Sequence, residues 1–188
     1  MNRRKALSSL SLLGVSGLVL PSLSLTGCQH PGYIARFFPQ EDLLLLDEIG
    51  ETILPTTEDS SGAKAAFVGN CIDTYIADCY TPELQKVINK GIARFKSLSM
   101  ERYGTSFLTL SPEQRKAYLQ DFNKYAHQHE ETLHPGESHH FFTLLKNLVI
   151  FTYFTSEIGA TQALRYVPIP GRYVGDFSYK EGDKAWAI

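Results

Sequence analysis

Residues 138–154, SHHFFTLLKNLVIFTYF, contain the stretch that decides the fold of this chain. Large apolar or aromatic side chains fill most positions from Phe141 to Phe154, so a helix formed here is apolar on nearly every side. Such a helix is stable only when other elements surround it. We therefore expect it at the centre of its domain, with Ser138 as its N-cap and Thr155 at its end.

Amphipathic stretches that can surround this helix precede it in the sequence. Each has apolar residues three or four positions apart and begins or ends at a capping residue. Turn-forming residues, TTEDSSG at 56–62, separate the first two stretches. The predicted helices run from Pro39 to the residue before Pro55, over residues 63–80, from the N-cap Thr81 to Gly104, and from the capping box Ser111-Pro112-Glu113-Gln114 onwards.

The sequence after the central helix predicts a short helix from Ser156, capped by Thr155, and then an irregular tail rich in Pro and Gly. We expect this tail to wrap the helices and to be pinned by Tyr173 and Trp186. No internal repeat indicates a solenoid. The predicted fold is all-α, a single compact helical domain of about five or six helices over residues 37–188.

The amino terminus has the pattern of an export signal. Three basic residues, Arg3, Arg4 and Lys5, precede a stretch without charge from Ala6 to Leu25. Several serines and a proline make this stretch too polar for a membrane-spanning helix, so we predict a signal that is cleaved. The Arg3-Arg4 pair resembles a twin-arginine export signal, but Ala6 stands where the usual pattern has a bulky apolar residue. The general secretory route therefore stays open beside the twin-arginine route.

The signal ends in Leu25-Thr26-Gly27-Cys28, which resembles the lipobox of bacterial lipoproteins. In a lipobox the cysteine is acylated and becomes the new amino terminus. We predict a lipoprotein signal peptide over residues 1–27, lipidation of Cys28 and a tether over residues 28–36, against the alternative of an ordinary buried cysteine. The mature chain is then expected at the periplasmic face of a bacterial membrane, held by its lipid anchor.

The composition limits the choice of partners. Removal of residues 1–27 takes away three basic residues and no acid, which leaves 15 basic and 20 acidic side chains and a net charge of −5. An acidic surface repels nucleic acid, so no nucleic-acid partner is expected.

The motifs of several enzyme classes are missing from the sequence. No G-x-G-x-x-G turn could bind a dinucleotide, no C-x-x-C-H could hold a c-type haem, and no G-x-S-x-G presents a nucleophile. We expect no catalytic, cofactor-binding or metal-binding residue, and a chain that is not catalytic alone.

Two cysteines, Cys71 and Cys79, lie in the predicted second helix. Eight residues of continuous helix separate their Cα atoms by about 12 Å, whereas a disulfide needs less than about 7 Å. Two buried, unpaired thiols are favoured over a disulfide.

Five histidines lie close together, at positions 127, 129, 134, 139 and 140. Metal ligands on one helix face are usually three or four residues apart. Here the pairs are two apart or adjacent, so their side chains diverge. A solvated loop between helices is favoured over a metal site.

The segment 145–173, LKNLVIFTYFTSEIGATQALRYVPIPGRY, is rich in aromatic residues and proline. Such residues are common in cores, but also at interfaces because they lose little entropy on docking. We predict partner contacts at Tyr153, Phe154, Tyr166, Pro168, Pro170, Gly171 and Tyr173, with a place in the core as the alternative.

Parts of this segment, Tyr153 to Gly159, Tyr166 and Pro168 to Gly171, resemble the signature of the gluconate 2-dehydrogenase subunit 3 family. The likeness includes Ile53-Leu54-Pro55-Thr56-Thr57 and Gly62-Ala63-Lys64-Ala65-Ala66, so it covers nearly the whole mature chain. Members of this family commonly have a twin-arginine leader without a lipobox, and this chain departs from them at Cys28.

The resemblance implies a non-catalytic accessory subunit, or maturation factor, of a membrane-associated FAD-dependent sugar or sugar-acid dehydrogenase. Its partners would be a flavoprotein subunit and a cytochrome c subunit, so FAD and haem c are expected in the partners. The family supplies no catalytic residue to carry over. The alternative function is a free-standing, lipid-anchored binding protein for a metal or small ligand.

Overall fold

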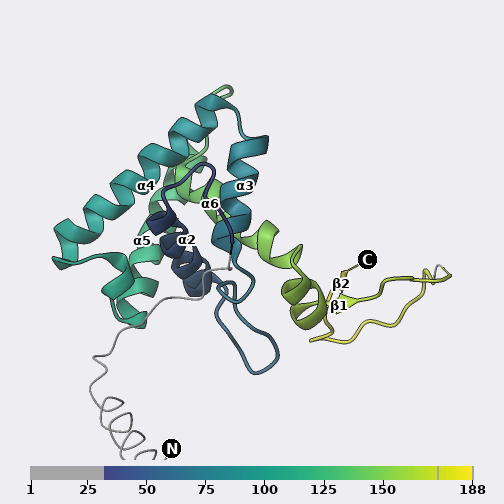
Figure 1. The fold of residues 1–188 in the computed structure, drawn as a ribbon. Helices are drawn as coiled ribbons and strands as arrows, with labels where there is room; N and C mark the ends of the chain where they lie inside the picture. Colours follow the sequence, from purple (N-terminus) through teal and green to yellow (C-terminus); the bar gives the residue numbers. More distant parts are fainter. Residues whose placement is uncertain (1–31, 173, 188) are drawn as a thin grey trace, which may run out of the picture.

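The computed structural model describes residues 32–172 and 174–187 as a set of packed helices with a projecting C-terminal segment (Figure 1). Apart from two strands of two residues each, the elements found in these residues are helices, which confirms the all-α prediction. They are α2 (Gln40–Ile53), α3 (Val68–Cys79), α4 (Pro82–Tyr103), η1 (Phe107–Thr109), α5 (Pro112–Glu131), α6 (Phe141–Phe154), η2 (Gly159–Ala163), β1 (Arg165–Tyr166) and β2 (Trp186–Ala187).

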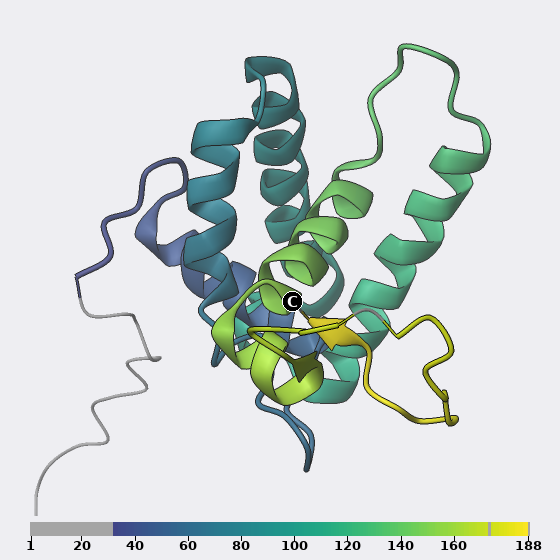
Figure 2. The same ribbon diagram turned by 90° about the vertical axis from the view of Figure 1, so that its right-hand side faces the viewer.

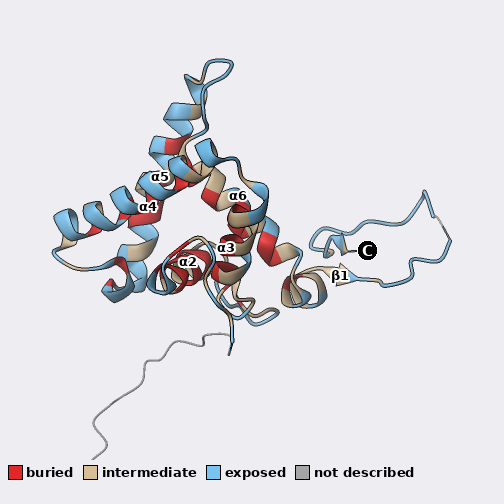
Figure 3. Cartoon of the chain, turned by 45° about the horizontal axis from the view of Figure 1, so that its top comes forward, coloured by how far each residue is buried: buried red, intermediate tan, exposed pale blue. Residues whose placement is uncertain are grey.

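Helix α6 is the centre of the helical domain, as predicted. It contacts α2, α3, α4 and α5, and Phe142, Leu145 and Val149 on it are buried. Figure 3 shows buried residues where α2, α3 and α6 meet, and further buried residues on α4 and α5. Helix α4 approaches α6 closely at Gly91, where a Cβ atom would lie 2.1 Å from the ring of Phe141. The core therefore depends on a residue without a side chain at this crossing.

Two of the predicted helices begin and end where their capping residues indicate. Thr81 caps α4 by accepting a hydrogen bond from the amide of Leu84, and Gly104 ends it with φ of 70°. Ser111 and Gln114 form the reciprocal capping box of α5. These ends are set by local chemistry that the sequence contains.

Other helix ends differ from the prediction. Helix α3 begins at Val68 and not at residue 63, because Phe67 has a left-handed backbone with φ of 51° and turns precede it. The N-cap of α6 is His140 and not Ser138: its ring nitrogen Nδ1 accepts the amide of Phe142 at 3.2 Å. Ser156, in place of Thr155, caps the turn that leads into η2, through its hydroxyl and the amide of Gly159.

Residues 33–38 are fixed to α3 by one buried carboxylate. Asp73 is 0% exposed and accepts hydrogen bonds from the amides of Arg36, Phe37 and Phe38, at 2.7, 3.0 and 2.7 Å. It also accepts the hydroxyl of Tyr33 at 2.7 Å. Burial alone would raise the pKa of Asp73, but these hydrogen bonds outweigh it and hold the pKa below its usual value. Residues 33–36, which the prediction assigned to the end of the tether, are thus packed on the domain.

The C-terminal tail does not wrap the helices as predicted. It projects from the domain beyond η2 and returns to pair β2 with β1 in parallel, Arg165 opposite Trp186 (Figures 1 and 3). Trp186 packs against Phe177 in the same segment, with ring centroids 5.3 Å apart, while Tyr173 lies outside the described residues. Among the residues that the structure describes, no helix has both the length and the apolarity of a membrane span.

Candidate functional site

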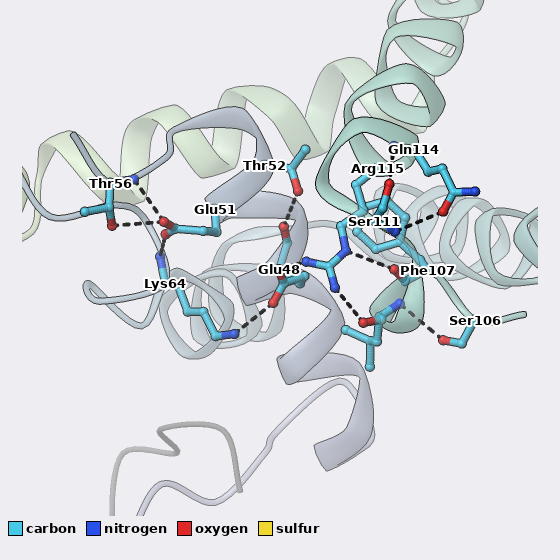
Figure 4. Close-up of polar contacts among 11 residues, drawn as sticks. Glu48, Glu51, Thr52, Thr56, Lys64, Ser106, Phe107, Ser111, Gln114 and Arg115 are labelled. Atoms are coloured by element: carbon cyan, nitrogen blue, oxygen red, sulfur yellow. Dashed lines mark hydrogen bonds and ion pairs between the residues drawn. The ribbon is translucent and has the colours of Figure 1, made fainter. Parts of the chain in front are cut away.

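The loop between α2 and α3, residues 54–67, is organised around Glu51 near the end of α2 (Figure 4). One carboxylate oxygen of Glu51 accepts the amide and the hydroxyl of Thr56 at 2.9 and 3.0 Å, and the other accepts the amide of Lys64 at 3.0 Å. A Cβ atom on Gly62 would lie 2.2 Å from this carboxylate. The two segments 53–57 and 62–66 therefore fold around a single side chain.

Glu48, one turn earlier on α2, joins this loop to α5. Its carboxylate accepts the ammonium of Lys64 at 2.8 Å and pairs with the guanidinium of Arg115 (Figure 4). Arg115 also donates to the carbonyl oxygens of Phe107 and Leu108 in η1. Glu48 and Arg115 are largely shielded from solvent, so this group of charges is a structural junction and not an open catalytic site.

The other side of the loop is attached to α6 and η2. The hydroxyl of Tyr153 donates to the carbonyl oxygen of Ser61 at 2.6 Å, and the amide of Ser61 donates to the side chain of Gln162 at 2.9 Å. A Cβ atom on Gly159 would lie 2.0 Å from the carbonyl oxygen of Tyr153, so the chain can turn this tightly only with glycine. One corner of the domain is thus formed by three segments that are distant in sequence: 53–57, 62–66 and 153–159.

This corner continues into the C-terminal arm, which we define as residues 165–172 and 174–187. The guanidinium of Arg165 lies 4.7 Å from the ring centroid of Trp186 and 5.9 Å from that of Phe177. The amides of Arg165 and Val167 donate to the carbonyl oxygens of Ala185 and Ala187 at 2.8 and 2.9 Å. These contacts close the arm on itself, and the ammonium of Lys184 also ties it to η2 by donating to the carbonyl oxygen of Gln162.

The arm exposes several large apolar side chains along a short stretch of sequence. Ile169 is 83% and Tyr179 76% exposed. The other exposed large apolar side chains of the arm are Tyr166, Val174, Phe177 and Trp186. Surfaces of this kind are typical of sites that another protein covers.

The predicted contact residues fall into three groups. Tyr153 is 3% exposed and Phe154 is half-buried against the core, so Tyr153 supports the corner from inside and presents no surface to a partner. Four of them, Tyr166, Pro168, Pro170 and Gly171, are exposed on the arm. Tyr173 lies outside the described residues, as do the predicted export residues Arg3 and Arg4 and the predicted lipidation residue Cys28.

Three of the histidines, His129, His139 and His140, have hydrogen-bond partners in and around the loop between α5 and α6. His139 pairs through Nδ1 with Glu130 at 2.6 Å, and Glu130 also accepts the amide of His140 at 3.1 Å. His129 contacts the carbonyl oxygen of Ser138 at 3.1 Å. In the described ranges no three His, Cys, Asp or Glu side chains are arranged to hold a metal ion.

Both thiols of α3 are free among the described residues, as predicted, but they are exposed and not buried. Cys71 and Cys79 line an apolar surface groove of about 470 Å³ with Tyr33, Thr74 and Tyr75.

Sequence reasoning missed the acids that organise the domain: Asp47, Glu48, Glu51 and Asp73. Asp47 is 5% exposed, and burial raises its pKa to about 6 although the amide of Gly69 donates to it at 2.8 Å. The signal for Asp47 and Asp73 was available, since each acid interrupts an apolar run, LLLLDEIG and NCIDTYI.

The model of the family described as Gluconate 2-dehydrogenase subunit 3 matches the chain over residues 40–171. The match runs from the start of α2 into the arm, and so includes the whole corner formed by residues 53–66 and 153–162. No curated protein and no solved structure matches the chain.

Proposed function

The chain belongs to the gluconate 2-dehydrogenase subunit 3 family, and on this basis we propose that it is a non-catalytic accessory subunit or maturation factor of a dehydrogenase complex. The complex would be a periplasmic, membrane-associated, FAD-dependent sugar or sugar-acid dehydrogenase. A flavoprotein subunit would hold the FAD and a cytochrome c subunit the haem c. Export would begin at the Arg3, Arg4 signal, and a lipid on Cys28 would keep the chain at the membrane.

The observation that carries this proposal is the corner that ends in the C-terminal arm. The corner is held from two sides: the carboxylate of Glu51 accepts the amide of Lys64, and the hydroxyl of Tyr153 donates to the carbonyl oxygen of Ser61. The arm beyond it exposes Tyr166 and Ile169 on a backbone that Pro168 and Pro170 restrain. A restrained apolar surface loses little entropy when a partner covers it.

Deletion of the gene tests the accessory role. The partner flavoprotein should then lose activity, accumulate unfolded or fail to reach its location, and the intact chain should restore it. Full activity and correct location of the flavoprotein in the deletion strain would refute the proposal.

Point variants test the arm as the contact. Tyr166→Ala and Ile169→Asp should weaken co-purification with the flavoprotein by about 1 to 3 kcal/mol if these residues are hot spots, without changing the melting temperature. Tyr125→Ala is the matched control, because Tyr125 on α5 is also well exposed but lies outside the arm. Equal loss of binding in the control and arm variants would show that the arm is not the contact.

A further inference from the structure

The point at which the folded domain begins is fixed on α3. Tyr33 is held by Asp73 and by the hydroxyl of Thr74 at 2.9 Å. The guanidinium of Arg36 makes two hydrogen bonds to the carboxylate of Asp78, at 2.5 and 2.7 Å. The chain therefore leaves the domain at Tyr33, beside α3.

Only four residues separate Tyr33 from Cys28 in the sequence. Five steps between Cα atoms span at most about 18 Å, whatever their conformation. Helix α4 alone, with 22 residues, is about 33 Å long. A lipid on Cys28 therefore holds the α3 side of the domain close to the bilayer and leaves too little chain for the opposite side to turn towards it.

The surface next to Tyr33 has the chemistry of a lipid contact. We call it the α3 face and define it by Tyr33, Ile34, Cys71, Thr74, Tyr75 and Cys79. Ile34 is 81% exposed, and the ring of Tyr75 packs on the exposed Phe151 at 5.3 Å. The groove in this face is lined by one charged residue, Asp78, and Arg36 neutralises it. Tyrosine and isolated apolar side chains without net charge favour the interface between headgroups and acyl chains.

The opposite edge of the domain carries exposed charged side chains of both signs. Figure 2 shows residues 32–38 at one edge and α5 at the other. The exposed residues of α5 include Glu113, Lys116 and Lys124. The C-terminal arm also lies apart from residues 32–38 (Figures 1 and 2).

We propose that the lipid-anchored chain lies on the membrane with its α3 face against the lipid headgroups, so that α5 and the C-terminal arm stay accessible to a protein partner. This orientation rests on the lipid anchor of the proposed function.

The native thiols Cys71 and Cys79 report on this face directly. In the acylated protein on phosphatidylglycerol and phosphatidylethanolamine vesicles, a membrane-impermeant maleimide should label them about tenfold more slowly than in a variant with ten Gly/Ser residues inserted after Gln29. That ratio is expected if the face spends roughly nine-tenths of its time on the bilayer. A fluorophore on these thiols should also be quenched by brominated lipid.

The control is Gln128→Cys on α5 in a background with Cys71→Ser and Cys79→Ser. Its labelling should not depend on tether length, and its fluorophore should not be quenched. A membrane-bound protein in which the α3 thiols and residue 128 behave alike would overturn the orientation and leave the anchor intact. A wild-type chain that takes up no radiolabelled palmitate and does not bind membranes would overturn both.

Discussion

Asp73→Asn should loosen residues 33–38, the segment that precedes α2 and packs on α3. Each carboxylate oxygen of Asp73 serves two donors, the amides of Phe37 and Phe38 on one side, the amide of Arg36 and the hydroxyl of Tyr33 on the other. An asparagine keeps one oxygen and turns an NH2 group towards the other pair of donors. Two hydrogen bonds to a charged group are then lost, at about 1.5 to 3 kcal/mol each.

Local opening keeps the loss of unfolding free energy below the sum for these two hydrogen bonds. Residues 33–38 can detach instead, which exposes the buried ring of Phe38 at a cost of about 1.5 to 3 kcal/mol. We therefore expect Asp73→Asn to lower the free energy of unfolding by about 3 kcal/mol. Because the folded-state pKa of Asp73 lies below the ordinary aspartate value of 3.8, the wild-type advantage should persist at neutral pH and fade as the pH drops below about 4.

Urea unfolding of the full chain, followed by circular dichroism at pH 7 and pH 3.5, measures both effects. Asp78→Asn is the matched control, since its exposed pair with Arg36 should contribute within about 1 kcal/mol. Equal, small losses for the two variants would refute the argument that the buried carboxylate holds the segment.

Three further changes test other parts of the domain. Asp47→Asn should stabilise the protein at pH 7 by about 1 to 3 kcal/mol, because the folded-state pKa of about 6 lies above the ordinary aspartate value of 3.8 and burial penalises the ionised form. Urea unfolding should show this gain shrinking between pH 7 and pH 4, and a gain independent of pH would contradict the cause. Tyr153→Phe should lower the free energy of unfolding by about 1 kcal/mol and speed proteolysis of residues 57–59, because the hydrogen bond to Ser61 is lost. Unchanged cleavage would mean that this hydrogen bond does not hold the loop. His140→Ala should lower the free energy of unfolding by about 1 kcal/mol at pH 8, because α6 loses its N-cap. Burial and His129 lower the pKa of His140, so the neutral ring supplies the cap. Its contribution to stability should fade as the pH falls below the ordinary histidine pKa of 6.5, which thermal melts at pH 8 and pH 5 would reveal or disprove.

The sequence was sufficient where structure follows from neighbouring residues. The caps of α4 and α5 are local hydrogen bonds between a side chain and an amide three residues on, so Thr81 and Ser111 could be identified directly. The central place of α6 also followed, because a helix that is apolar on most sides has no other stable environment.

Features that depend on distant residues could not be predicted in this way. The start of α3 is delayed to Val68 because Glu51 and Tyr153 hold the preceding loop, and neither contact is visible in the local pattern. The same holds for the C-terminal arm. Its proline and aromatic residues suit either a wrapped tail or a projecting one, and contacts within the arm, such as Arg165 on Trp186, favour the second.

The pairing of β1 with β2 brings Arg165 and Trp186 to the spacing of neighbouring strands, about 4.8 Å, although 20 residues lie between them in the sequence. A loop closed at its base can change length at little entropic expense, since doubling it costs only about 0.6 kcal/mol. The arm is therefore an interchangeable module. Its tip could be lengthened, shortened or grafted from another chain while the helices keep their packing, and selectivity for a partner could diverge without redesign of the scaffold.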